Sequence, residues 1–135
     1  MATMSTIMSA FVDRYSPAPG RTVTVTGGTL YHNFLVTPEM ATEWLELSKP
    51  AAWASLQDPS EWEQSGASSD QIIAAGKLVD YYAGLMRLDK WGEPPHNWQQ
   101  DPVTLADLRV QAGGHRLAAV LKSGMAQRFH ILVIG

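Results

Sequence analysis

Leu108-Arg-Val-Gln-Ala-Gly-Gly-His-Arg-Leu-Ala-Ala-Val-Leu-Lys-Ser-Gly124 is the stretch that decides how this chain folds. It predicts a strand, a double-glycine turn and a short helix that begins at His115 and Arg116 and ends at Gly124. A glycine turn that leads into a helix leaves backbone N–H groups unpaired at the positive end of the helix dipole. The stretch therefore predicts an anion-binding turn, with two side chains beside it that can carry positive charge.

The segment after this stretch is a further strand candidate. Residues 128–134 are almost continuously apolar, which is typical of a strand covered on both faces in the middle of a sheet. A short edge strand is expected over 103–105, directly after Pro102. With a strand over 108–111, the glycine turn and the helix, the order is that of a βαβ-like unit. A right-handed crossover would place the helix start at the carboxyl edge of the sheet, where ligands collect.

The N-terminal half of the chain carries a hairpin pattern. Residues 22–26 alternate with period two, a Gly-Gly pair follows at 27–28, and a second strand-like run covers 29–36. Two such runs around a glycine pair predict a β-hairpin with a tight turn. Residues 1–21 are expected to be a flexible lead-in, because the segment 16–20 is rich in Pro and ends any early helix.

Two longer helices are expected in the middle of the chain. The first begins at Thr37-Pro38-Glu39, where Thr can cap and Pro fits the first helical position, and it ends near Ser48. The second begins after Ser68, which forms a capping-box pattern with Gln71, and continues through residue 87. The apolar stripes expected to be buried are Met40, Trp44 and Leu47 in the first helix and Ile72, Ala75, Val79, Tyr82, Ala83 and Met86 in the second.

Composition indicates one globular domain. The chain has 135 residues, of which 45% are hydrophobic and 17% charged, and these are globular values. A single domain over 22–135 is expected, of the α/β (α+β) class, with a small mixed sheet and three or four helices. The absence of cysteine excludes disulfides, Cys-ligated zinc and thiol catalysis. No apolar run approaches the ~20 residues of a membrane helix, and the first ten residues do not read as a secretory signal, so a cytoplasmic location is expected.

Four blocks of the sequence together resemble one family. Residues 112–119 resemble the phosphate-binding turn of the ParB/sulfiredoxin superfamily, within a degenerate form of the motif D-G-Q-H-R-L-A-A-V-x-x-S-G. The likeness is closest to the ParB-like domain proteins of actinobacterial bacteriophages. Residues 37–45 match their pattern T-P-E-x-A-x-x-W-L, residues 82–91 resemble Y-A-x-x-M-R-x-G-x-W, and 129–134 resemble their final apolar strand. The resemblance covers residues 36–135.

This resemblance implies a fold and a site. It implies a ParB/sulfiredoxin-like domain in which Gly113, Gly114, His115 and Arg116 hold the phosphates of a nucleotide. Sulfiredoxins and a free-serine kinase use ATP and partition ParB proteins use CTP, so ATP or CTP is the implied cofactor. The implied activity is phosphoryl transfer or hydrolysis in DNA metabolism, in the host cytoplasm for a phage-encoded protein. The residue types fit, since glycines let the backbone approach phosphate and Arg offers a bidentate fork.

Two departures from the family motif leave the activity open. Gly114 stands where sulfiredoxins have their catalytic cysteine, which excludes sulfiredoxin chemistry. Ala112 stands where the phage and kinase versions have an Asp, whose carboxylate would help to hold Mg²⁺. No catalytic residue is therefore assigned.

Three readings of function follow from these departures. The first is the nucleotide-binding protein described above. The second is a non-catalytic family member that acts by contact with a phage or host protein. The third is a DNA-binding protein or nuclease, against which the net charge of −3 counts. A homodimer is compatible with each of them.

The remaining chemistry-bearing residues carry no predicted site. The histidines at positions 32, 96, 115 and 130 show no pair at a metal-ligand spacing, so no metal site is expected. The five tryptophans are expected to fill the core and pin loops, Trp53 and Trp62 among them, rather than to stack on bases.

Overall fold

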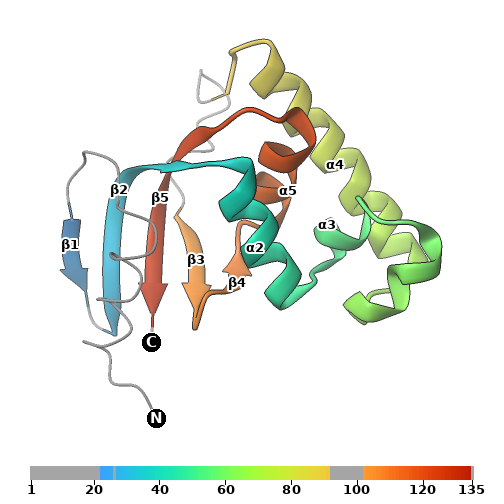
Figure 1. The fold of residues 1–135 in the computed structure, drawn as a ribbon, viewed down its shortest axis with the longest axis horizontal. Helices are drawn as coiled ribbons and strands as arrows, with labels where there is room; N and C mark the ends of the chain where they lie inside the picture. Colours follow the sequence, from blue (N-terminus) through green and yellow to red (C-terminus); the bar gives the residue numbers. More distant parts are fainter. Residues whose placement is uncertain (1–21, 26, 92–101, 135) are drawn as a thin grey trace.

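Five strands form one mixed sheet in the order β1-β2-β5-β3-β4 (Figure 1). The computed structural model describes residues 22–25, 27–91 and 102–134, with side chains from residue 27 onward. The strands are β1 (Thr22–Val25), β2 (Gly28–Val36), β3 (Val103–Ala106), β4 (Arg109–Ala112) and β5 (Gln127–Ile134). The predicted lead-in over 1–21 lies outside the described residues.

The helices gather on one side of the sheet (Figure 1). They are α2 (Pro38–Ser48), α3 (Ala51–Ala54), α4 (Ser69–Arg87) and α5 (Gly114–Ser123), with a 3₁₀ helix η1 (Pro59–Ser65) between α3 and α4. α5 lies between α2 and α4. A small mixed sheet with helices confirms the α/β (α+β) fold class.

Short sequence patterns predicted most of the helices and strands correctly. β1 and β2 pair antiparallel as the predicted hairpin, with Val25 opposite Gly28. The Thr37 hydroxyl caps α2 by accepting from the Met40 amide. Ser68 and Gln71 form the predicted capping box at the start of α4. Each of these features depends on residues only a few positions apart, which is why the sequence alone defines them.

The buried side of α2 differs from the predicted stripe. Ala41, Trp44 and Leu45 are fully buried, whereas Leu47 is 42% exposed. The stripe passes through 41, 44 and 45, and at 100° per residue Leu47 lies roughly 110° around the helix from its centre. The expectation for Leu47 was therefore wrong. In α4, Tyr82 is half-buried and the rest of its predicted stripe is buried.

The position of β3 in the sheet contradicts two predictions, the edge strand over 103–105 and the βαβ-like unit. β3 was expected at an edge, but it lies between β5 and β4, and β4 is the edge strand. β3 runs parallel to β5 and antiparallel to β4. β4 and β5 are therefore not the parallel pair of a βαβ unit. α5 starts after Ala112, which lies opposite Thr104, so its N-terminus lies where β4 ends and β3 begins.

β5 is the central strand, as expected, but its two faces differ. Phe129, Ile131 and Val133 are fully buried on the face toward the helices. His130 and Leu132, on the opposite face, are half-buried. Both faces are therefore covered, the face toward the helices completely and the opposite face in part.

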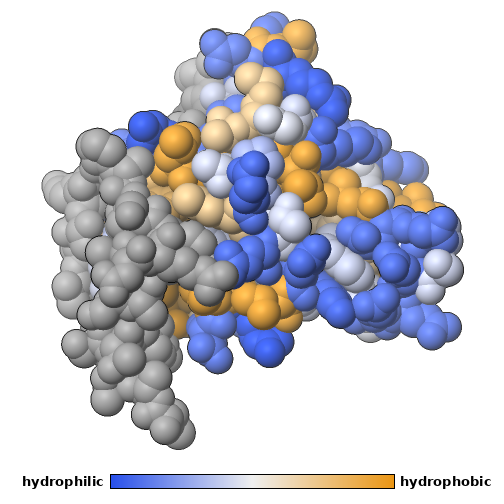
Figure 2. Space-filling model, viewed as in Figure 1, coloured by the Kyte–Doolittle hydropathy of each residue, from blue (hydrophilic) through white to orange (hydrophobic). Residues whose placement is uncertain are grey.

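One hydrophobic core joins the sheet to the helices. Its largest fully buried side chains include Trp44, Phe34 and Phe129. Trp53 is buried and Trp62 is half-buried against the same core, so both pin the segment between α2 and α4 as expected. Figure 2 shows mainly hydrophilic residues over the helical part of the visible face, with separate apolar patches between them. None of the described helices is long and apolar enough to cross a membrane.

Candidate functional site

The turn before α5 is built on Gly113. Its φ is +92°, a left-handed conformation that glycine adopts without a steric penalty. A Cβ at this position would lie 2.8 Å from Cγ2 of Val103 in β3. The turn therefore requires glycine both for its backbone angle and for its close approach to the sheet.

The N-terminus of α5 has no side-chain cap. Thr37 and Ser68 cap α2 and α4 through their hydroxyls, but Gly113 at the N-cap of α5 has no side chain that could do so. The first bond of the helix joins the Leu117 amide to the Gly113 carbonyl. Because the preceding N–H groups of a helix have no acceptor within it, they present donors and the positive dipole end to an anion.

Two hollows adjoin this helix start. One, of about 270 Å³, is lined by Gly113, Gly114 and His115 on one side and by residues 50–52 on the other. The second, of about 460 Å³, lies between α3 and α4 and is lined mainly by small apolar side chains together with Gln71. Ala51 and His115 line both hollows. The predicted anion turn thus lies beside a largely apolar groove.

His115 separates the two hollows. Its ring is half-buried, and burial holds its pKa below the ordinary histidine value of 6.5. The imidazole is therefore mostly neutral at pH 7. Within the described part of the chain its ring nitrogens have no hydrogen-bond partner.

Arg116 lies against the turn from a different side. Its Nη2 donates to the Pro102 carbonyl at 3.3 Å, and it lies 3.0 Å from the position that a Cβ on Gly113 would take. Burial raises the pKa of Tyr82, and the nearby Arg116 charge partly opposes that rise. The four predicted residues therefore meet at one turn. His115 faces the hollows, whereas Arg116 lines neither of them and reaches toward Pro102 and Tyr82.

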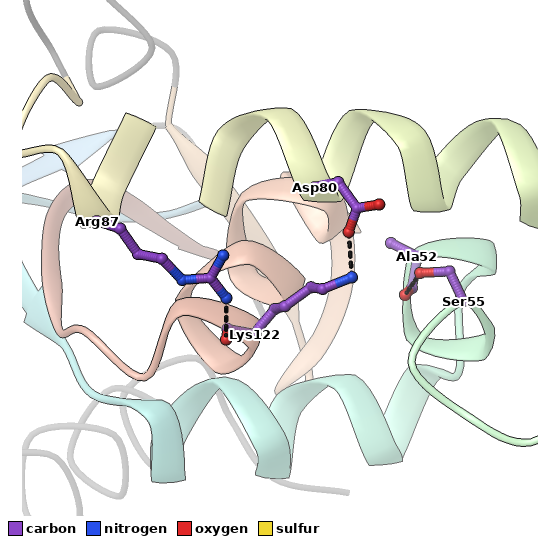
Figure 3. Close-up of polar contacts among 5 residues, drawn as sticks. All are labelled: Ala52, Ser55, Asp80, Arg87 and Lys122. Atoms are coloured by element: carbon purple, nitrogen blue, oxygen red, sulfur yellow. Dashed lines mark hydrogen bonds and ion pairs between the residues drawn. The ribbon is translucent and has the colours of Figure 1, made fainter. Parts of the chain in front are cut away.

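Polar contacts fasten the other end of α5 to α4. Lys122 forms an ion pair with Asp80, and Arg87 donates from Nη2 to the Lys122 carbonyl at 2.9 Å (Figure 3). On α3 the Ser55 hydroxyl donates to the Ala52 carbonyl at 2.6 Å. The first two contacts therefore fasten α5 to α4, whereas the third lies within the end of α3.

A metal-binding carboxylate is absent from the turn, and one histidine contact elsewhere was not predicted from the sequence. Ala112 lines the smaller hollow and offers no carboxylate to a metal. Among the described residues, no group of three or more His, Cys, Asp and Glu side chains could hold a metal ion. His32 and His130 lie with their Nδ1 atoms 3.2 Å apart, a contact that the spacing of the histidines in the sequence did not predict. These two histidines are 98 positions apart in the sequence. They meet because β2 pairs with β5 in the folded sheet.

Comparisons with protein-family models, with curated proteins and with solved structures give no match for this chain. Membership of the ParB/sulfiredoxin superfamily therefore stays a prediction from the sequence motif.

Proposed function

We propose that this chain is a nucleotide-binding protein of the ParB/sulfiredoxin type that holds phosphate at Gly113, Gly114, His115 and Arg116. The observation that carries the proposal is the glycine-opened, uncapped start of α5 beside a groove of sufficient size. Ligand pockets of this kind are mostly apolar, with a few polar groups that fix orientation.

The turn before α5 and the two adjoining hollows suggest an orientation for the bound nucleotide. The helix N–H groups offer donors to the phosphates beside the smaller hollow, and Arg116 adds positive charge from the other side of the same turn. The larger hollow, with Gln71 as its polar side chain, receives the base and sugar. ATP and CTP are the proposed ligands. The nucleotide phosphates, rather than a protein carboxylate, coordinate the Mg²⁺ ion in this proposal. The proposed setting is a phage-type protein in the host cytoplasm.

The lack of a carboxylate at Ala112 favours a second candidate function. This candidate is a family member without catalysis that acts on a phage or host protein, alone or as a homodimer. It predicts nucleotide binding without turnover, whereas the enzyme reading predicts Mg²⁺-dependent hydrolysis or transfer. A phosphate-release assay with ATP and CTP, with and without Mg²⁺, separates the two. A salt-dependent mobility shift with DNA tests the third reading, which the net charge of −3 disfavours.

Arg116→Ala tests the binding proposal directly. We expect calorimetric titration with ATP, CTP and GTP to show binding to the wild-type chain, and an affinity loss of about tenfold or more in the variant. Arg128→Ala is the matched control, because Arg128 is exposed on β5 and donates to the Asn33 carbonyl in β2, away from the turn before α5. Absence of binding heat with all three nucleotides in the wild type would refute the proposal.

A further inference from the structure

His32 and His130 form a pair on the side of the sheet away from the proposed nucleotide site. His32 belongs to β2 and His130 to the neighbouring strand β5. Their Nδ1 atoms are 3.2 Å apart, and their ring centroids are 4.8 Å apart with planes at 80°. Because strand side chains alternate and Phe129 and Ile131 face the helices, His130 points to the opposite face.

A β-bulge brings the two rings together. The register passes from Tyr31 opposite Ile131 to Phe34 opposite Phe129, so two residues of β2 oppose His130 alone. A bulge of this kind redirects a side chain. The second bulge residue, Asn33, has a φ of +53°, and its carbonyl accepts a hydrogen bond from Arg128 at 2.7 Å.

The separation of the two nitrogens fits a chelated metal ion. Two metal–nitrogen bonds of about 2.0–2.1 Å that meet at a tetrahedral or octahedral angle place their nitrogens roughly 2.9–3.4 Å apart. The observed 3.2 Å lies within this range. Both histidines are half-buried, so each remains in part accessible to solvent.

We propose that His32 and His130 bind one divalent transition-metal ion of the Zn²⁺, Ni²⁺ and Cu²⁺ class through their Nδ1 atoms. Without metal, one neutral ring donates its Nδ1 proton to the Nδ1 of the other. Metal binding moves that proton to Nε2 of the same ring through solvent, so each ring presents a lone pair and no net proton is released at neutral pH.

The ligand set determines which ions bind. Among the described residues no third His, Cys, Asp or Glu completes a metal-binding group around the pair, so water fills the other positions and the ion exchanges readily. Two imidazoles favour Cu²⁺ over Ni²⁺ and both over Mn²⁺. Mg²⁺, which prefers oxygen ligands, should not bind here.

The test uses the full untagged chain and the metal salts alone. Calorimetry with Ni²⁺, Zn²⁺ and Cu²⁺ should show one site, and His32→Gln and His130→Gln should each weaken it by about tenfold or more. His115→Gln is the control, because His115 lines the hollows beside α5, and it should bind the metal ions as the wild type does. Loss of metal binding in His115→Gln alone, or unchanged binding in both pair variants, would overturn the proposal.

A second measurement keeps the test decisive where a variant does not fold. In the wild-type chain, Ni²⁺ or Cu²⁺ should broaden NMR signals around His32 and His130 first, and EDTA should restore them. Broadening centred elsewhere, or no binding of any of the three ions at about 1 mM, contradicts the site, because a geometry suited to chelation should bind these ions more tightly.

Discussion

Gly113 is the residue on which the start of α5 depends. It combines a positive φ with close contact to Val103. Its role could be predicted, because a glycine pair between a strand pattern and a helix pattern is a local signal. The pairing of His32 with His130 could not, because it needs the register of two strands far apart in sequence and a bulge in one of them.

Gly113→Ala should destabilise the protein by about 2–4 kcal/mol, because it adds backbone strain and a clash with β3. Gly124→Ala is the matched control. Gly124 also has a positive φ, of +70°, but a Cβ there would meet nothing within 4 Å, so the loss should be about 1 kcal/mol. Urea unfolding of both variants measures the difference, and equal losses would show that contact with Val103 does not matter.

His115 should make stability depend on pH. Burial holds its folded-state pKa below the value of 6.5 that applies in the unfolded chain. The unfolded chain therefore takes up the proton more readily, so this contribution to stability is complete above about pH 6.5 and is lost as the pH falls through the folded-state pKa. Unfolding of the wild type and His115→Gln should be measured from pH 7.5 to 5 in the presence of EDTA. The wild type should lose more stability than the variant, and parallel curves would contradict the assignment.

At the scale of single elements, helix ends were the most predictable feature. Thr37 and Ser68 cap the helices that their sequence contexts predicted, and Gly124 ends α5. Burial was less predictable, as Leu47 shows, because the apolar residues of α2 define more than one stripe and only packing chooses between them.

Ser68→Ala should weaken α4 by about 1 kcal/mol. The Ser68 hydroxyl accepts from the Gln71 amide at 3.2 Å, and the Gln71 side chain accepts from the Ser68 amide at 2.8 Å. Ser69→Ala is the control, because Ser69 is exposed at the first helical position and its change should stay within about 0.5 kcal/mol. Thermal unfolding followed by circular dichroism compares the two, and an equal effect would argue against the capping box.

At the scale of the whole molecule, the fold class could be predicted and the strand order could not. The short run at 103–106 follows Pro102 and resembles an edge strand, yet Val103 and Leu105 are fully buried. β3 pairs with a strand that is distant in the sequence, and Val103 lies opposite Ile131 of β5. No local pattern carries that information, so the expected pairing of β4 and β5 in a βαβ-like unit was also wrong.

Leu105→Ala tests the interior position of β3. Because Leu105 is fully buried, the substitution should cost about 2–5 kcal/mol in unfolding free energy. Val110→Ala, at a half-buried position on the edge strand β4, should cost clearly less. Denaturant unfolding gives both values. A loss at Leu105 no greater than at Val110 would contradict the interior placement of β3.

The central position of β5 also governs how this protein reaches its native state. β5 joins two hairpins, β1–β2 and β3–β4, that do not otherwise pair. Its pairing with β2 closes a long loop, which reaches from Gly28 to Ile134. Such non-local pairing slows folding, because the entropy of loop closure is lost before the contacts compensate for it. During synthesis the two hairpins can form as they leave the ribosome, but the sheet stays divided until residues 127–134 emerge. In that interval the open edge of β2 can pair with other chains, so aggregation during translation competes with the arrival of the strand that completes the sheet.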